Sequence, residues 1–278
     1  MKSEKGVLHV VATPIGNLGD ISERAIETLR RVDLICAEDT RHTRPLLSHF
    51  GIDKPLFALH DHNEDAAAEQ IIERMQQGAS VALVSDAGTP LVSDPGFRLV
   101  RAAREAGFKV SPVPGASALV AALSVAGLPS DKFVFEGFLS SKSSARRARM
   151  QTLASENRTV IFYESSHRIV EHLQDALETF GAQRHIVIAR ELTKLFETVL
   201  DGSIEAVLAR VNADHNQQKG EFVVLVSGAP ESEDAKLIEG QRIYKVLSEH
   251  LKPSVAAKIA AELSGASRKA LYGGDAQA

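Results

Sequence analysis

The sequence predicts an α/β protein made of two α/β domains and a small helical C-terminal segment. Short β-branched runs alternate with helical patterns from the start of the chain, and a second series of such runs follows. The last part carries helical patterns without a strand pattern. At 278 residues and 44% hydrophobic content, the chain is long enough for two domains with their own cores.

The N-terminal α/β domain, residues 1–126, is predicted to contain a mostly parallel sheet. Helical patterns at 22–32 and 64–77 separate its strands, and this alternation implies right-handed crossovers and helices on both faces. A further helical pattern follows Gly96, where Asp94 is placed to act as the cap. The expected strands are 7–12, 33–37, 55–60, 80–85 and 109–113.

The C-terminal α/β domain, residues 127–230, is predicted to contain a mixed sheet. A cluster of turn residues at 126–132 marks the domain break. Only a few residues separate the runs 185–191 and 197–202, which indicates an antiparallel hairpin. The expected strands are 133–139, 159–164, 185–191, 197–202 and 221–227.

The C-terminal segment, residues 235–278, follows a short acidic linker and is predicted to be helical and basic. Residues 235–272 hold seven Lys or Arg against three Asp or Glu, whereas the whole chain has a net charge of −4. A small-residue turn between two helical halves resembles a helix-turn-helix. A plain bundle of surface helices explains the same pattern equally well.

Composition excludes several protein classes. Cys36 is the single cysteine, so no disulfide framework forms within the chain, as expected for a cytoplasmic protein. The first apolar run resembles a strand rather than a signal peptide, and the weakly polar run 115–128 is too short to span a membrane. With 5% aromatic residues and no Trp, a broad stacking platform for single-stranded nucleic acid is disfavoured.

Three glycine-containing loops follow strands of the first domain, at 12–20, 85–96 and 112–118. Each loop alone is explained by an ordinary turn. Together they fall at the carboxyl ends of strands of one sheet, which is where open α/β sheets bind ligands. The sequence therefore predicts a ligand site at this edge.

The loops indicate a nucleoside-like ligand that is not rich in phosphate. The chain has no G-x-G and no G-K dipeptide, which disfavours NAD and ATP. Residues 83–96 hold no lysine, and their charged residues are Asp86 and Asp94. A ligand with cationic and hydroxyl groups suits a carboxylate, and S-adenosylmethionine is one such ligand.

Several motifs resemble the tetrapyrrole methylase superfamily, and within it the bacterial small-subunit ribosomal RNA cytidine 2′-O-ribose methyltransferases. The resemblance runs in order from residue 7 to about residue 227, through "TPIGNLGD", "AEDTRHT", "ALHDHNE", "SDAGTPLVSDPG", "VPGASA", "EGFL", "YESSHR", "ARELTK" and "KGEFV". It implies two α/β domains with a cleft between them that binds S-adenosylmethionine. It also implies 16S rRNA or the small ribosomal subunit as the partner, and a homodimer.

By the same resemblance, the cofactor site draws on both domains. The expected cofactor-binding residues are Pro14, Gly16, Asp86, Ala87, Gly88, Gly115, Ser117, Tyr163 and Arg190. A local turn or cap is the structural alternative for Asp86. The resemblance also suggests a phosphate or substrate role for Arg41 and His42, for which a packed polar loop is the alternative.

Methyl transfer to a ribose hydroxyl requires loss of a proton, and "RELTKLFE" offers candidates at the end of an expected strand. These are Glu191, Lys194 and Glu197, and we hypothesise that Lys194 with Glu197 assists deprotonation. A surface ion-pair cluster is the alternative.

The densest basic stretch, "KSSARRAR", follows "EGFL" and is the candidate RNA contact through Lys142, Arg146, Arg147 and Arg149. A solvated helix face is its alternative. His60, Asp61 and His62 raise the question of a metal, but no third cluster with matching spacing exists, so no metal site is expected.

Two other functions stay open. One is methyl transfer to a tetrapyrrole, another small molecule or a protein side chain. The other is RNA binding without catalysis.

Overall fold

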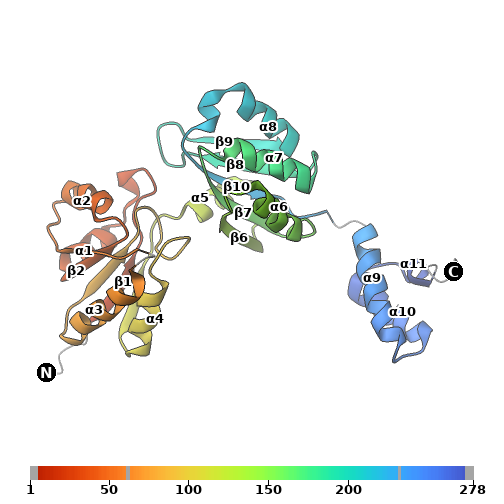
Figure 1. Ribbon diagram of the computed structural model, residues 1–278, viewed down its shortest axis with the longest axis horizontal. Coiled ribbons are helices and arrows are strands. Elements are labelled where there is room, and N and C mark those ends of the chain that lie inside the picture. Colours follow the sequence, from red (N-terminus) through yellow and green to blue (C-terminus); the bar gives the residue numbers. More distant parts are fainter. Residues whose placement is uncertain (1–5, 61–62, 231–232, 273–278) are drawn as a thin grey trace.

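The computed structural model describes residues 6–60, 63–230 and 233–272, and Figure 1 shows two α/β domains followed by a separate group of helices. Both α/β domains contain a five-stranded sheet. Each strand predicted from the sequence is present, and its ends agree with the prediction to within two residues. The predicted fold class is therefore confirmed.

The first sheet is parallel and has the strand order β3-β2-β4-β1-β5. Strands β2 and β4 are buried along their whole length, as expected for a sheet covered on both faces. The strands are β1 (Val7–Val11), β2 (Leu34–Ala37), β3 (Leu56–Ala58), β4 (Val81–Val84) and β5 (Lys109–Val113).

Helices cover the two faces of this sheet in pairs. Helices α1 (Glu23–Arg31) and α2 (Thr40–His49) share one core with the sheet, and α3 (Glu64–Gln76) and α4 (Phe97–Glu105) share the other. Cys36 lies in the second of these cores, and burial raises the pKa of its thiol to about 12. It is a core residue, as its apolar neighbours in the sequence indicate.

The N-terminus of α4 is capped by a residue distant in the sequence. Glu64 Oε1 accepts hydrogen bonds from the backbone amides of Gly96 at 3.0 Å and Arg98 at 2.7 Å. The partner of these two amides is thus Glu64 of α3 rather than Asp94, the residue predicted from the sequence.

The second sheet is mixed and has the order β6-β7-β10-β8-β9. Strand β6 is parallel to β7, whereas every other pair is antiparallel, so the predicted β8–β9 hairpin is present. One face carries α6 (Ser143–Thr152), α7 (Ile169–Phe180) and α8 (Ile204–Ala213). The strands are β6 (Phe133–Phe138), β7 (Thr159–Ser165), β8 (His185–Arg190), β9 (Thr198–Ser203) and β10 (Glu221–Val226).

Helix α5 (Ala118–Val125) connects the two domains (Figure 1). By sequence it ends the first domain, yet Leu119 and Ala122 pack with Ile161 and Leu225 of the second sheet. Packing thus places α5 with the second domain, and the chain passes between the domains near Ser117. This helix sets the second sheet against the loops that follow β1, β4 and β5.

The C-terminal helices are α9 (Glu233–Ser248), α10 (Pro253–Ser264) and α11 (Arg268–Tyr272). They form a small core of their own around Ala260, Ala266 and Leu271. Figure 1 shows this group lying apart from the two sheets. Within the described parts of the chain, no helix has the length and apolar character needed to cross a membrane.

Candidate functional site

The loops after β1 and β4 are joined at the carboxyl edge of the first sheet. Thr13 and Gly88 exchange two backbone hydrogen bonds, of 2.8 and 3.1 Å. Gly88 has a φ of +81°, which favours glycine, and a Cβ there would lie 3.3 Å from Ile15. The expected meeting of these loops at one edge is therefore present.

A cavity of about 380 Å³ lies between these loops and the second sheet. This volume is within the range of small-molecule sites. The first domain contributes Asp86, Ala87 and Gly88, and the second contributes Tyr163 and Lys194. Ser117, which precedes α5, also lines this cavity, as do Phe138 and Glu221, which the sequence analysis did not single out.

A second cavity of about 470 Å³ adjoins the first. Pro14 and Gly16 line it, together with His42, Thr43 and His49 of α2. Both cavities share a wall of Ile15, Asp86, Ala87, Lys194 and Glu221. The site thus has two adjoining compartments with one ammonium and two carboxylates at the boundary.

Two residues expected to bind the cofactor line neither cavity. Gly115 lies against the residue that follows β1, where an added Cβ would be 3.0 Å from the Cβ of Ala12. Arg190 is buried and donates to the carbonyls of Lys219 at 2.6 Å and Phe196 at 2.9 Å. Arg190 therefore holds the β8–β9 connection, and its guanidinium is engaged with backbone carbonyls.

Lys194 forms an ion-pair cluster at the boundary of the two cavities. Its Nζ donates to Glu191 Oε1 and to Glu221 Oε2, each at 2.8 Å. Partial burial lowers the pKa of Lys194, but the hydrogen bonds to the two carboxylates outweigh this effect and leave the pKa raised. The ammonium is thus held in its charged form.

Glu197 has a different role from the one hypothesised. Its Oε2 accepts from the backbone amide of Thr193 at 2.6 Å and so holds the loop. The carboxylates that orient Lys194 are Glu191 and Glu221 instead. Glu221 was not predicted because it begins β10, and the antiparallel direction of β10 brings this end beside the carboxyl ends of β7 and β8.

Asp86 joins α2 to the loop after β4. Its Oδ1 accepts from the backbone amide of Asp39 at 3.1 Å, and its Oδ2 lies 3.0 Å from His42 Nδ1. Hydrogen bonding to Asp86 and attraction to Asp86 and Asp39 raise the pKa of His42. His42 thus faces the second cavity with a carboxylate behind it.

Strained backbone is concentrated at this site. Among the described residues other than glycine, positive φ angles occur at Leu91, Ser93, Glu191 and Thr193. They belong to the loops after β4 and β8, which supply Asp86 and Lys194 to the shared wall. Such backbone strain is common at functional sites. The residue types at these four positions do not predict it.

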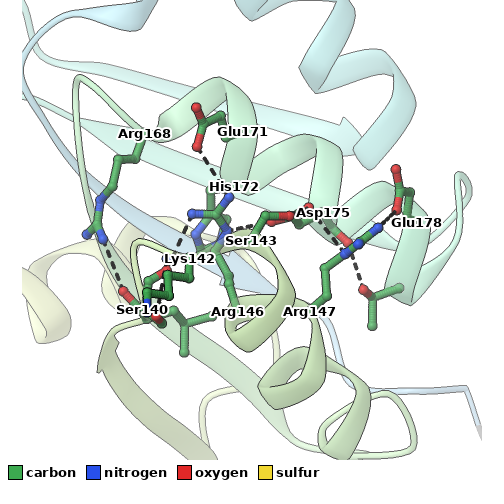
Figure 2. A network of polar contacts seen from close by, with 12 residues as sticks. Ser140, Lys142, Ser143, Arg146, Arg147, Arg168, Glu171, His172, Asp175 and Glu178 are labelled. Carbon is green, nitrogen blue, oxygen red and sulfur yellow. Dashed lines mark hydrogen bonds and ion pairs between the residues drawn. The ribbon is translucent and has the colours of Figure 1, made fainter.

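The basic stretch forms α6 with its preceding loop, and Figure 2 shows Arg146 and Arg147 in a network of polar contacts within the second domain. Arg146 is fully buried and donates to Asp175 at 2.6 Å. Arg147 pairs with Glu178, and Arg149 pairs with Glu136 at 2.7 Å. The expectation that Arg146 contacts RNA is therefore corrected: its burial makes it a structural residue. Lys142 is exposed.

No group of three metal-ligating side chains is present in the described ranges. Asp61 and His62, which raised the question of a metal, lie outside those ranges.

The two domains meet where Gly16 contacts the stem of Lys194. A Cβ on Gly16 would lie 2.5 Å from Lys194 Cγ, and the φ of Gly16 is +148°. We expect Gly16→Ala to lower the free energy of unfolding by about 1–3 kcal/mol. We expect Gly16→Ala to cause a smaller loss of unfolding free energy in a Lys194→Ala background, where the aliphatic part of the lysine side chain is absent.

Urea denaturation of wild type, both single variants and the double variant measures this coupling. Gly181→Ala is the control, since Gly181 has a φ of +88° and an added Cβ there meets nothing within 4 Å. Additive losses at Gly16 and Lys194 would contradict the contact.

Comparison with known proteins points to one group. Residues 7–208 match the family model described as Tetrapyrrole (Corrin/Porphyrin) Methylases, and residues 234–273 match the model described as RsmI C-terminal HTH domain. The chain is 65% identical to "Ribosomal RNA small subunit methyltransferase I" of Xylella fastidiosa (strain Temecula1), over 98% of this chain and 100% of that protein.

A protein of the same name from Haemophilus influenzae is 51% identical, over 96% of this chain and 95% of its own length. Among solved structures, the uroporphyrin-III-C-methyltransferase of Thermus thermophilus superposes with a TM-score of 0.56 at 19% identity. The superposition covers 80% of this chain and 94% of the chain of that structure. That likeness concerns the fold.

Proposed function

This chain belongs to the tetrapyrrole methylase family, within its group of ribosomal RNA small subunit methyltransferases I, and from this premise we propose its reaction. It transfers a methyl group from S-adenosylmethionine to the ribose 2′ oxygen of a cytidine in 16S rRNA. The names of the relatives support methylation of small-subunit ribosomal RNA. The choice of the 2′ oxygen and of cytidine rests on the motifs that resemble that branch.

The observation that carries the proposal is the pair of cavities with one shared wall. A two-substrate transfer needs one compartment for the donor and another for the acceptor, arranged so that the reacting atoms meet. The two adjoining cavities, which share Asp86, Ala87 and Lys194, support such an arrangement.

The first cavity fits S-adenosylmethionine. It is of suitable size, and Gly88 allows close approach to its wall. The carboxylates of Asp86 and Glu221 suit cationic groups, and Tyr163 and Phe138 offer apolar surface. Asp86, Ala87, Gly88, Ser117 and Tyr163 would hold the molecule, which supplies an electrophilic methyl group on a sulfonium.

The second cavity is proposed to receive the ribose. Helix α2 lines it with His42, Thr43 and His49, and on the same helix Arg41 and Arg44 are exposed. An RNA phosphate can approach basic side chains there. This favours α2 over α6 as the main RNA contact, because α2 lines a cavity whereas Arg146 of α6 is buried. Arg41 pairs with Asp39 at 2.6 Å, but its side chain is 88% exposed.

The test uses the whole protein with S-adenosylmethionine labelled in the methyl group and small ribosomal subunits from a strain that lacks this protein. We expect label in 16S rRNA and none in subunits from the parent strain. A 2′-O-methyl group blocks alkaline cleavage at its own nucleotide, so the label is expected in an alkali-resistant dinucleotide that contains cytidine.

Label in a mononucleotide after alkali would indicate base methylation and contradict the choice of oxygen. Transfer to a tetrapyrrole or a protein, with none to RNA, would overturn the proposal. RNA binding without transfer would assign the protein to the non-catalytic class.

We also propose that the protein works in the cytoplasm as a homodimer. Its one buried cysteine suits a reducing compartment, and the dimer rests on resemblance to the superfamily. Light scattering of the purified chain tests the dimer, and a monomer would contradict it.

A further inference from the structure

We propose that His42 is the residue that takes the proton from the ribose hydroxyl, with Asp86 as the carboxylate that orients its ring. This inference rests on the proposed function and names a catalytic group for it. It replaces the sequence-based hypothesis that Lys194 with Glu197 performs this step.

The geometry of the His42–Asp86 pair leads to this assignment. His42 Nδ1 lies 3.0 Å from Asp86 Oδ2. A carboxylate only accepts hydrogen bonds, so Nδ1 carries the hydrogen and Nε2 keeps the lone pair in the neutral ring. The backbone amide of Asp39 donates to the other oxygen of Asp86 at 3.1 Å, which fixes the carboxylate. A base held by an oriented carboxylate is a recurring arrangement for proton transfer.

The position of the pair fits the reaction. His42 lines the second cavity, whereas Asp86 lies on the wall that both cavities share. The ring thus reaches the acceptor compartment next to the boundary at which the methyl group is transferred. His42 is 71% exposed, so incoming RNA can reach it.

The charged groups around His42 support a base that works near neutral pH. Asp86 and Asp39 raise its pKa, and Arg41 lowers it by a smaller amount. From the second domain, Lys194 and Glu221 line the same cavity as one ion pair, and His49 lies further along α2. Lys194 cannot serve as the base in this form, because its two carboxylate partners keep it protonated.

The transfer is balanced in protons and electrons with the ribose hydroxyl, His42, the methyl donor and water alone. The 2′ oxygen gives its proton to His42 Nε2 while it forms the bond to the methyl carbon. The methyl–sulfur bond breaks and leaves its electron pair on sulfur, so the sulfonium becomes a neutral thioether. The imidazolium then loses the proton to water, which restores the base.

The test compares His42→Asn with wild type in single turnover at saturating donor and subunits. The asparagine amide can replace Nδ1 as donor to Asp86 but offers no counterpart of Nε2. We expect the rate to fall about 10²- to 10⁴-fold, with unchanged affinity for S-adenosylmethionine by equilibrium dialysis. His185→Asn is the control, since His185 is exposed and lines neither described cavity, and we expect it to keep the wild-type rate and pH profile.

A second measurement does not depend on catalysis. In the free protein, NMR titration is expected to give His42 a pKa above 6.5, and Asp86→Asn is expected to bring it down. In wild type, the logarithm of the single-turnover rate should rise with pH and level off above the pKa of His42, since only the neutral ring accepts a proton. This acid limb should be absent from His42→Asn.

A wild-type rate in His42→Asn, or a change in the KM for subunits alone, would overturn the assignment while leaving the proposed reaction in place. Failure of the wild-type protein to methylate RNA would instead overturn the proposed function. An unchanged pKa of His42 in Asp86→Asn would contradict the role given to Asp86.

Discussion

Replacing Arg146 by leucine is expected to lower the free energy of unfolding by about 3–5 kcal/mol. The Arg146 side chain is fully buried on α6 and bonds to Asp175 of α7, whose side chain is 8% exposed. Loss of the guanidinium leaves this carboxylate buried with weaker partners, namely Ser143 at 2.9 Å and Arg147 at 3.8 Å (Figure 2). Urea denaturation measures the loss.

The matched control is Arg147→Leu, the next residue on the same helix. Its side chain is 47% exposed, and exposed ion pairs contribute about 0–1 kcal/mol. A double variant, Arg146→Leu with Asp175→Leu, should regain part of the stability because it removes the stranded charge. Equal stability of the two single arginine variants would contradict a structural role for Arg146.

Replacing Lys194 by methionine is expected to lower the single-turnover rate of methyl transfer about 10²- to 10³-fold. The ammonium sits at the shared wall, held by Glu191 and Glu221. We propose that it stabilises the ribose oxygen there as this atom loses its proton. Lys219→Met is the control, since Lys219 is exposed and is absent from the lining of both described cavities. A wild-type rate in Lys194→Met would rule this role out.

The pH dependence separates Lys194 from His42. The pKa of Lys194 is raised above the usual value of 10.5, so its charge is constant between about pH 6 and 9. The rate should therefore follow His42 alone and level off within this range. A rate that keeps rising toward pH 10 would favour Lys194 as the base and contradict our assignment.

The strands were predictable because their signal is local. Runs such as 81–84 and 222–226 are continuous and apolar, and burial on both faces of a covered sheet demands that pattern. The three glycine loops were also predictable, because parallel strands place their carboxyl ends at one edge. The missing lysine in residues 83–96 led to the prediction of Asp86 as a site residue, and Asp86 lies on the wall of both cavities.

The partners of charged side chains were not predictable. Lys194 does pair with Glu191, which is close in sequence, but its second partner is Glu221, 27 positions away, rather than the nearby Glu197. Arg146 belongs to a basic run that resembles a solvated face, yet it is buried because Asp175 of α7 receives it. The local sequence around His42 does not indicate which residue it contacts. The loop after β4 brings Asp86 to it in the folded chain.

The sequence by itself determined the two sheets, their order of elements and the edge at which a ligand site is expected, since these follow from periodicity and turn chemistry within short windows. The tertiary structure alone decided which charges are paired, which arginine is buried and which histidine lines the second cavity. Ion pairs and cavities depend on distances of a few ångströms between residues far apart in the chain, and no local pattern encodes such distances.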